Sequence, residues 1–348
     1  MRIHSFPIYR FIASFFLVFF HYGRSTELAN SVFFVGTVIF FFVLSGYVLT
    51  LGYIEKKVVF WDYFKARLYR IAPVYFLALF IATLLQTVPL SKRAFIFSLF
   101  FLQAWFPPAP NMINGQAWYI SALMSLYVIF PFILLVIKSI KPKTGKLVVY
   151  ALIFWAFSLT VSTNLLNTPK FYKPYPSVSH DLIFYFPPVH LASFLLGVAG
   201  AYYFLSIKTR KFSPLFIKIG LFLSIIITIG LLNNSVWVSN VLGFTLPISA
   251  GLYAPLFLAL ILFSSLAEKI RTPKWLQHPF FAYLGDLSYP IYVLQLPFFY
   301  MYMKYLQPLL NIETKSIFYA YFLLLFIFSM LVNKYFEKPL TRLLARKF

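Results

Sequence analysis

The chain contains no cysteine, and its few histidines are scattered. The absence of cysteine excludes disulfides, thiolate catalysis and cysteine-ligated metals. The five histidines, at positions 4, 21, 180, 190 and 278, show no spacing typical of metal ligands. The sequence motifs of zinc proteases, serine hydrolases and phosphate loops are also missing. We therefore expect no metal site and no permanently bound cofactor.

Charge is scarce as well. Only 11% of the residues are charged, against about 25% in a typical soluble domain, whereas 61% are hydrophobic and 22% are aromatic. Apolar runs of membrane-spanning length recur from one end of the chain to the other. These features predict an all-α integral membrane protein, a polytopic helical bundle that forms one domain over residues 1–348 among membrane lipids. The net charge of +22 arises in short loops between apolar runs, which argues against a nucleic-acid partner.

The apolar runs predict about ten transmembrane helices, and the basic residues predict their orientation. With the N-terminus in the cytoplasm, most of the 30 Lys and Arg residues lie on the cytoplasmic side, as the positive-inside rule requires. Both termini are then cytoplasmic, and a short apolar stretch at 94–106 is re-entrant or interfacial. The oligomeric state stays open. The predicted spans are 8–22, 32–53, 72–88, 118–138, 147–163, 188–206, 215–233, 248–267, 281–304 and 316–335.

Arg10 and His21 are the two ionisable groups that stand out in the first apolar run. A step of eleven residues is almost three helical turns, so both side chains share one face, about 16 Å apart along the axis. Ionisable groups on an apolar helix are costly in lipid, which favours a polar cavity on that face. The alternative is a snorkelling arginine at one interface and a Tyr/His belt at the other.

A second basic pair lies in the segment FKARLYRIAP. Arg67 and Arg70 are three residues apart, so on a helix their guanidinium groups project from neighbouring positions. Two forked cations at a membrane surface suit a phosphate or pyrophosphate group. Positive-inside anchoring, or contact with lipid phosphates, explains the same spacing equally well.

Several motifs, in order along residues 10 to 339, resemble those of the membrane-bound acyltransferase-3 family. The match includes an Arg-x10-His first helix, a Phe-Phe-x-x-Ser-Gly second span, a cytoplasmic Arg-x-x-Arg and a late Ser-Tyr-x-x-Tyr helix. Each motif is weak alone, but their order and spacing are specific. The matching stretches are RFIASFFLVFFH, FFVLSGYVLT, RLYR, WYISALMSLYVIFP, LGDLSYPIYVLQLP and YFEKP.

The resemblance implies an O-acyltransferase, most plausibly an O-acetyltransferase of polysaccharide biosynthesis in the bacterial inner membrane. Such enzymes move an acyl group from cytoplasmic acyl-CoA (here acetyl-CoA, as donor substrate) to a hydroxyl of an envelope carbohydrate or glycolipid. His21 is then the candidate general base, because imidazole titrates near working pH. Arg10 would hold donor phosphates or polarise the developing oxyanion. Arg67 and Arg70 would bind the CoA phosphates.

Other polar and aromatic residues of these motifs are further candidates. Trp118 and Tyr127 could stack on a sugar or on pantetheine, although packing explains such aromatics more often. Ser288 and Tyr292 could form hydrogen bonds within the cavity. Gly46, in the second span, is expected to allow close helix packing.

The chain departs from the family pattern at two places. Many members carry glutamates where this chain has Leu123 and Met124, and many carry a histidine where Gln295 stands. Two other functions stay open. A transporter or flippase could use the Arg/His face to bind an anionic substrate during translocation. An acyl-group channel could instead supply a partner transferase.

Overall fold

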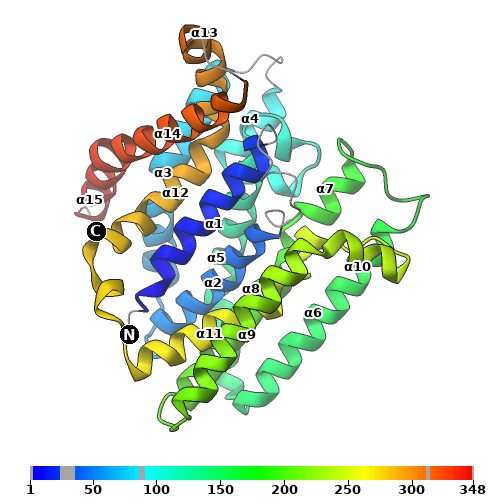
Figure 1. Ribbon diagram of the computed structural model, residues 1–348, viewed down its shortest axis with the longest axis vertical. Helices are drawn as coiled ribbons and strands as arrows, with labels where there is room; N and C mark the ends of the chain where they lie inside the picture. Colours follow the sequence, from blue (N-terminus) through cyan, green and yellow to red (C-terminus); the bar gives the residue numbers. More distant parts are fainter. Residues whose placement is uncertain (1–2, 24–35, 86–90, 311–313, 347–348) are drawn as a thin grey trace.

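The computed structural model describes residues 3–23, 36–85, 91–310 and 314–346, and all regular structure in these ranges is helical (Figure 1). This confirms the predicted all-α class. Each of the ten predicted spans overlaps a long helix, and residues 32–35 and 86–88 of two of these spans lie outside the described residues. These helices are α1 (Ser5–Tyr22), α2 (Thr37–Tyr53), α3 (Phe60–Leu85), α5 (Trp118–Ile140), α6 (Thr144–Leu166), α8 (Pro187–Ile207), α9 (Pro214–Asn233), α11 (Ala254–Ile270), α12 (Pro279–Met301) and α14 (Thr314–Val332).

Shorter helices connect the long ones. Two π-helical segments, Tyr302–Leu306 and Asn333–Glu337, extend α12 and α14, and 3-10 turns at Gln103–Trp105, Ala109–Asn111 and Gly115–Ala117 lead into α5. The remaining α-helices are α4 (Lys92–Leu99), α7 (Val178–Phe184), α10 (Ser235–Leu242), α13 (Gln307–Leu310) and α15 (Lys338–Arg346).

Seven helical segments in the described ranges are both long and apolar enough to cross a membrane. The helices α2 and α11 have 17 residues each and fall short of that length. The count of ten spans and the cytoplasmic position of both termini therefore stay predictions. The helix α4 overlaps the predicted stretch 94–106 and has eight residues, so it is about 12 Å long. The hydrocarbon core of a bilayer is about 30 Å thick. The helix is therefore too short to span the membrane alone.

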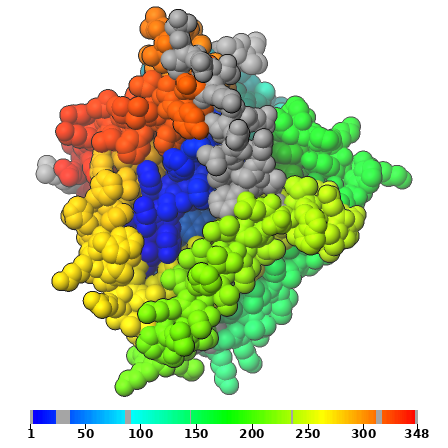
Figure 2. Space-filling view, in the orientation of Figure 1, coloured from blue at the N-terminus to red at the C-terminus, as the bar shows by residue number. Residues whose placement is uncertain are grey.

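The first helix runs through the middle of the bundle and is fixed at several points. Figure 1 shows α1 beside α12 and α2. The Ser14 hydroxyl donates to the carbonyl of Ser288 at 2.9 Å, and Gly285 faces Pro7 with no room for a side chain. One face of α1 is open to lipid: Ile12 is 41% exposed, and part of the helix (blue) is visible in Figure 2 between the C-terminal helices and α9.

A buried carboxylate caps the start of α1. Glu268 of α11 accepts the backbone N–H of His4 at 2.6 Å and that of Ser5 at 2.7 Å. A negative charge at a helix N-terminus satisfies unpaired N–H groups and interacts favourably with the helix dipole. This cap holds the first turn of α1 against α11 and so fixes the position of Arg10.

The helices α2 and α8 pack so closely that only glycine fits at two positions of their contact. A methyl group built on Gly46 would overlap the Phe194 carbonyl oxygen, and one on Gly197 would overlap the Val43 carbonyl oxygen. The two backbones therefore touch directly. This confirms the packing role that the sequence predicts for Gly46.

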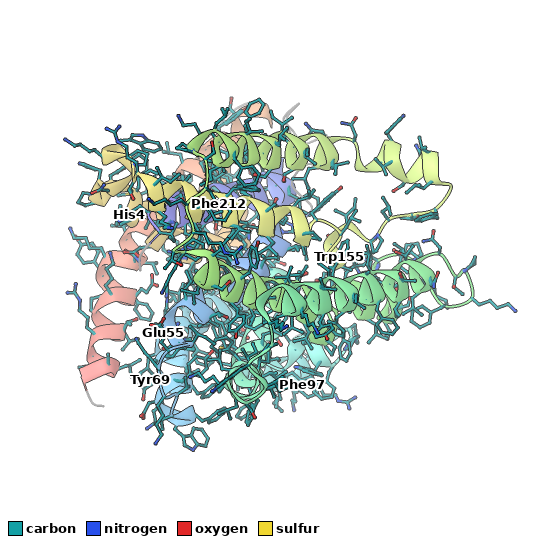
Figure 3. The ribbon with its side chains drawn as sticks, turned by 90° about the horizontal axis from the view of Figure 1, so that it is seen from below. His4, Glu55, Tyr69, Phe97, Trp155 and Phe212 are labelled. Carbon is teal, nitrogen blue, oxygen red and sulfur yellow. The ribbon has the colours of Figure 1, made fainter. Side chains whose placement is uncertain are left out.

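Three segments that are far apart in the sequence lie at one side of the bundle. Figure 3 shows His4, Glu55 and Tyr69 on the same side of the molecule, although they belong to the N-terminus, the connection after α2 and the RLYR segment. The Thr341 hydroxyl of α15 donates to the Tyr69 carbonyl at 3.3 Å, so the last described helix packs against that segment.

Candidate active site

A cavity of about 460 Å³ lies between α1, α2, α3, α5 and α12, and we call it the main cavity. Its lining comes from helices that are far apart in the sequence, so only the packed bundle creates it. Six of the eight predicted site residues line it: Arg10, Arg67, Arg70, Tyr127, Ser288 and Tyr292.

The charge of the main cavity is positive. Arg10 from α1 meets Arg67 and Arg70 from α3, and the one acidic residue in the lining is Asp286 of α12. Asp286 is already paired, because its Oδ2 lies 3.0 Å from Nζ of Lys338. A cavity lined by three guanidinium groups and one neutralised carboxylate favours an anionic ligand.

Two of the arginines keep unused hydrogen-bond donors. The Nε atoms of Arg10 and Arg67 are buried and have no partner among the described residues. Arg67 also donates from Nη2 to the Tyr53 hydroxyl at 3.1 Å, and its guanidinium carbon lies 5.7 Å from that ring and 5.8 Å from the Tyr63 ring. The two tyrosines therefore fix this arginine. Buried N–H groups without partners cost free energy, which an anion bound in the cavity would offset.

Aromatic residues also line the main cavity. The rings of Tyr119 and Tyr292 lie 5.3 Å apart, and the Tyr289 hydroxyl donates to the carbonyl of Ile71 at 2.7 Å. Ser288 also contributes to the lining, and its hydroxyl donates to the Gly285 carbonyl at 2.7 Å within α12. These aromatic rings and hydroxyl groups suit an uncharged chain with a few hydrogen-bonding groups.

His21 lies at the far end of α1 and is not part of the main-cavity lining. A chain of hydrogen bonds connects the two regions. The Tyr292 hydroxyl donates to the Gln116 carbonyl at 2.7 Å, and Gln116 Nε2 donates to the hydroxyl of Tyr22, the neighbour of His21, at 3.3 Å. Arg10 and His21 both lie on α1, as predicted. The side chains of Tyr292 and Gln116, however, stand between the main cavity and Tyr22.

Trp118 also lies outside the lining. Its side chain is 8% exposed and packs against Tyr185 and His190, with ring centroids 4.9 and 5.1 Å away. The structure places this residue in an aromatic cluster, which corresponds to the packing interpretation of its position. Tyr127, by contrast, is partly buried and faces the main cavity.

Sequence reasoning missed Asp286 and Tyr119. The sequence did contain a signal for Asp286. The chain has only eight acidic residues, and one of them inside an apolar helix indicates a functional position. Tyr119 offered no signal, because the chain has 25 tyrosines and spacing does not distinguish one that faces a cavity.

The positions that depart from the family pattern fall in two environments. Leu123 lines the main cavity with an apolar side chain, whereas Met124 is buried outside it. Gln295 is fully buried, and its Nε2 donates to the Tyr292 carbonyl at 2.8 Å. The amide therefore supports the segment that carries Tyr292.

The fold and the cavity define an integral membrane protein with an arginine-lined site between its helices. The acyltransferase-3 family model, described as acyltransferase domain, matches residues 3–334. The chain belongs to this acyltransferase family, which confirms the resemblance seen in its motifs. No curated protein and no solved structure matches the chain.

Proposed function

We propose that the protein is a membrane O-acyltransferase, specifically an O-acetyltransferase, of the bacterial inner membrane. It would transfer an acyl group from cytoplasmic acyl-CoA to a hydroxyl of an envelope polysaccharide or glycolipid. Family membership supports acyltransferase activity. The observation that carries the donor assignment is the main cavity, where Arg10, Arg67 and Arg70 converge.

The main cavity suits the two chemical parts of acyl-CoA. The diphosphate of CoA is anionic and matches the forked N–H groups of Arg67 and Arg70. The pantetheine arm is uncharged and matches the tyrosine-rich wall that includes Tyr119 and Tyr292. In this arrangement the thioester lies deeper in the bundle than the nucleotide.

The proposed reaction needs a base near the acceptor. The hydroxyl oxygen attacks the thioester carbonyl carbon, the carbon–sulfur bond breaks, and CoA leaves as the thiolate. His21 would accept the hydroxyl proton, a role that contributes typically 10²–10⁴-fold to rate. Reacting atoms must come within about 3–3.5 Å. The Tyr292–Gln116–Tyr22 hydrogen bonds separate the main cavity from the end of α1, so the pantetheine arm would have to displace them to bring the thioester to His21.

The proposal is tested with the purified protein in lipid nanodiscs, supplied with isotopically labelled acetyl-CoA and envelope glycans. We expect mass spectrometry to detect labelled acetyl groups on the glycan. Glycan that crosses the membrane of proteoliposomes without modification would support the flippase instead. Modification that requires a second, added transferase would support the acyl-group channel.

Replacing Arg67 or Arg70 with alanine is expected to raise the apparent KM for acetyl-CoA about tenfold. Each change removes charge-assisted hydrogen bonds to the donor, and a bond to a charged group contributes about 1.5–3 kcal/mol. The KM for the acceptor should change much less. The measurement is steady-state kinetics with each substrate varied in turn.

Arg210→Ala is the matched control, because Arg210 is exposed in the connection between α8 and α9 and lines none of the cavities described for this chain. An unchanged donor KM in the Arg67 and Arg70 variants would assign both residues to membrane anchoring.

A further inference from the structure

A second cavity, of about 380 Å³, lies beside the main one, and we call it the side cavity. It is formed where the start of α12 meets the helix that continues from α14 into α15. Three of its lining residues are cationic and none is acidic. The lining residues are Tyr283, Asn333, Lys334, Lys338, Pro339 and Arg342.

The cations of the side cavity form a stripe. Lys334, Lys338 and Arg342 are spaced by four residues, so the helix presents them on one side. Among the described residues, no ion pair involves Lys334 or Arg342. Their charges are therefore available to an anion.

The side cavity adjoins the main cavity through α12. Ala282 and Asp286 of this helix line the main cavity, whereas Tyr283 lines the side cavity. The ion pair between Asp286 and Lys338, at 3.0 Å, joins the two linings directly. A ligand with anionic groups in both cavities would pass this pair.

An aromatic ring accompanies the cations. The ammonium group of Lys338 lies 5.3 Å from the centre of the Tyr283 ring, which is partly buried. A base can stack on such a ring, and cations beside it can bind the phosphate of the same nucleotide. A ring next to three cations suits a phosphorylated nucleoside better than it suits a free inorganic anion.

We propose that the side cavity binds the 3′-phosphorylated adenosine end of the acyl-CoA donor. This inference rests on the proposed function, because it extends the donor from the main cavity into its neighbour. Lys334 and Arg342 bind the 3′-phosphate, and Tyr283 stacks on the adenine. The phosphate of an anionic lipid headgroup has the same chemistry, but the Asp286–Lys338 contact with the main cavity favours the donor.

The test compares the binding of CoA and of dephospho-CoA, which lacks the 3′-phosphate, to the purified full-length protein in nanodiscs. We expect the wild-type protein to bind CoA about tenfold more tightly, because charge-assisted contacts to one phosphate are lost with dephospho-CoA. In the Lys334→Ala/Arg342→Ala double variant the two dissociation constants should become nearly equal. Lys338 is left intact, since its removal would leave Asp286 unpaired at the main cavity.

The Arg210→Ala/Lys211→Ala variant is the charge-matched control. It also removes one arginine and one lysine, both exposed and outside the linings of both cavities, and it should keep the tenfold preference for CoA. Tyr283→Ala should weaken the binding of both ligands by a similar factor, because the adenine is common to them.

Three outcomes would overturn the assignment, each in a distinct way. In the first outcome, the double variant keeps the wild-type preference for CoA and the wild-type protein transfers acetyl groups. This result overturns the side-cavity site and leaves the proposed function standing. In the second outcome, native mass spectrometry shows that the double variant has lost bound phosphatidylglycerol, while its preference for CoA is unchanged. This result assigns the side cavity to a lipid headgroup. A wild-type protein that binds no CoA and transfers no acetyl group contradicts the proposed function and this site together.

Discussion

Replacing His21 with alanine is expected to lower acetyl transfer by about 10²–10⁴-fold, because the acceptor hydroxyl then has no base to take its proton. His21→Gln should be equally inactive, since an amide keeps polarity and approximate size but does not accept a proton at neutral pH. CoA binding should persist in both variants, because His21 lies outside the main cavity where the donor phosphates are proposed to bind. The measurements are turnover and CoA affinity on the same purified samples.

His4→Gln is the control for this experiment. His4 precedes the opposite end of α1, and its contact with Glu268 uses the backbone N–H, which the substitution keeps. This variant should transfer at the wild-type rate. Normal turnover in His21→Ala would remove the general-base role and leave His21 as part of an interfacial aromatic belt.

Gly46→Ala is expected to destabilise the folded protein by about 1–3 kcal/mol, the usual cost of forcing extra volume into a packed interior. The new methyl group would overlap the Phe194 carbonyl oxygen, and this backbone atom has no rotamer by which to move away. Helices α2 and α8 would have to separate. The measurement is the thermal midpoint of the detergent-solubilised protein, followed by the fraction that stays monodisperse after heating.

The same helix offers a matched control. A methyl group on Gly52 of α2 meets nothing within 4 Å, so Gly52→Ala should leave the midpoint unchanged or raise it, because alanine favours the helix by about 0.5–1 kcal/mol. An equal midpoint for Gly46→Ala and the wild-type protein would show that α2 and α8 tolerate a wider spacing.

The residues of the main cavity could be predicted where local periodicity carried the information. Arg10 stood out as an ionisable group on an apolar helix, and the Arg67–Arg70 spacing indicated two neighbouring cations. The structure places all three in one cavity. The position of Trp118 could not be predicted in this way. Helical spacing does not say whether an aromatic ring meets a cavity or other rings, and here it meets Tyr185 and His190.

The sequence by itself determined the class of the protein. Scarce charge and recurring apolar runs required a helical membrane protein, because backbone polar groups in lipid must be satisfied within each segment. The positions of the long helices followed from the same runs, and the ordered motifs indicated the family that the match over residues 3–334 confirms.

Only the tertiary structure decided which helices meet. The approach of α2 to α8 depends on two glycines in separate helices, and the cap of α1 depends on Glu268, far along the chain. The side cavity likewise forms where the start of α12 meets the helix that continues from α14, and Asp286 of α12 lies 3.0 Å from Lys338 there. Such contacts depend on the packing of whole helices against one another, and the local periodicity of the sequence does not predict them.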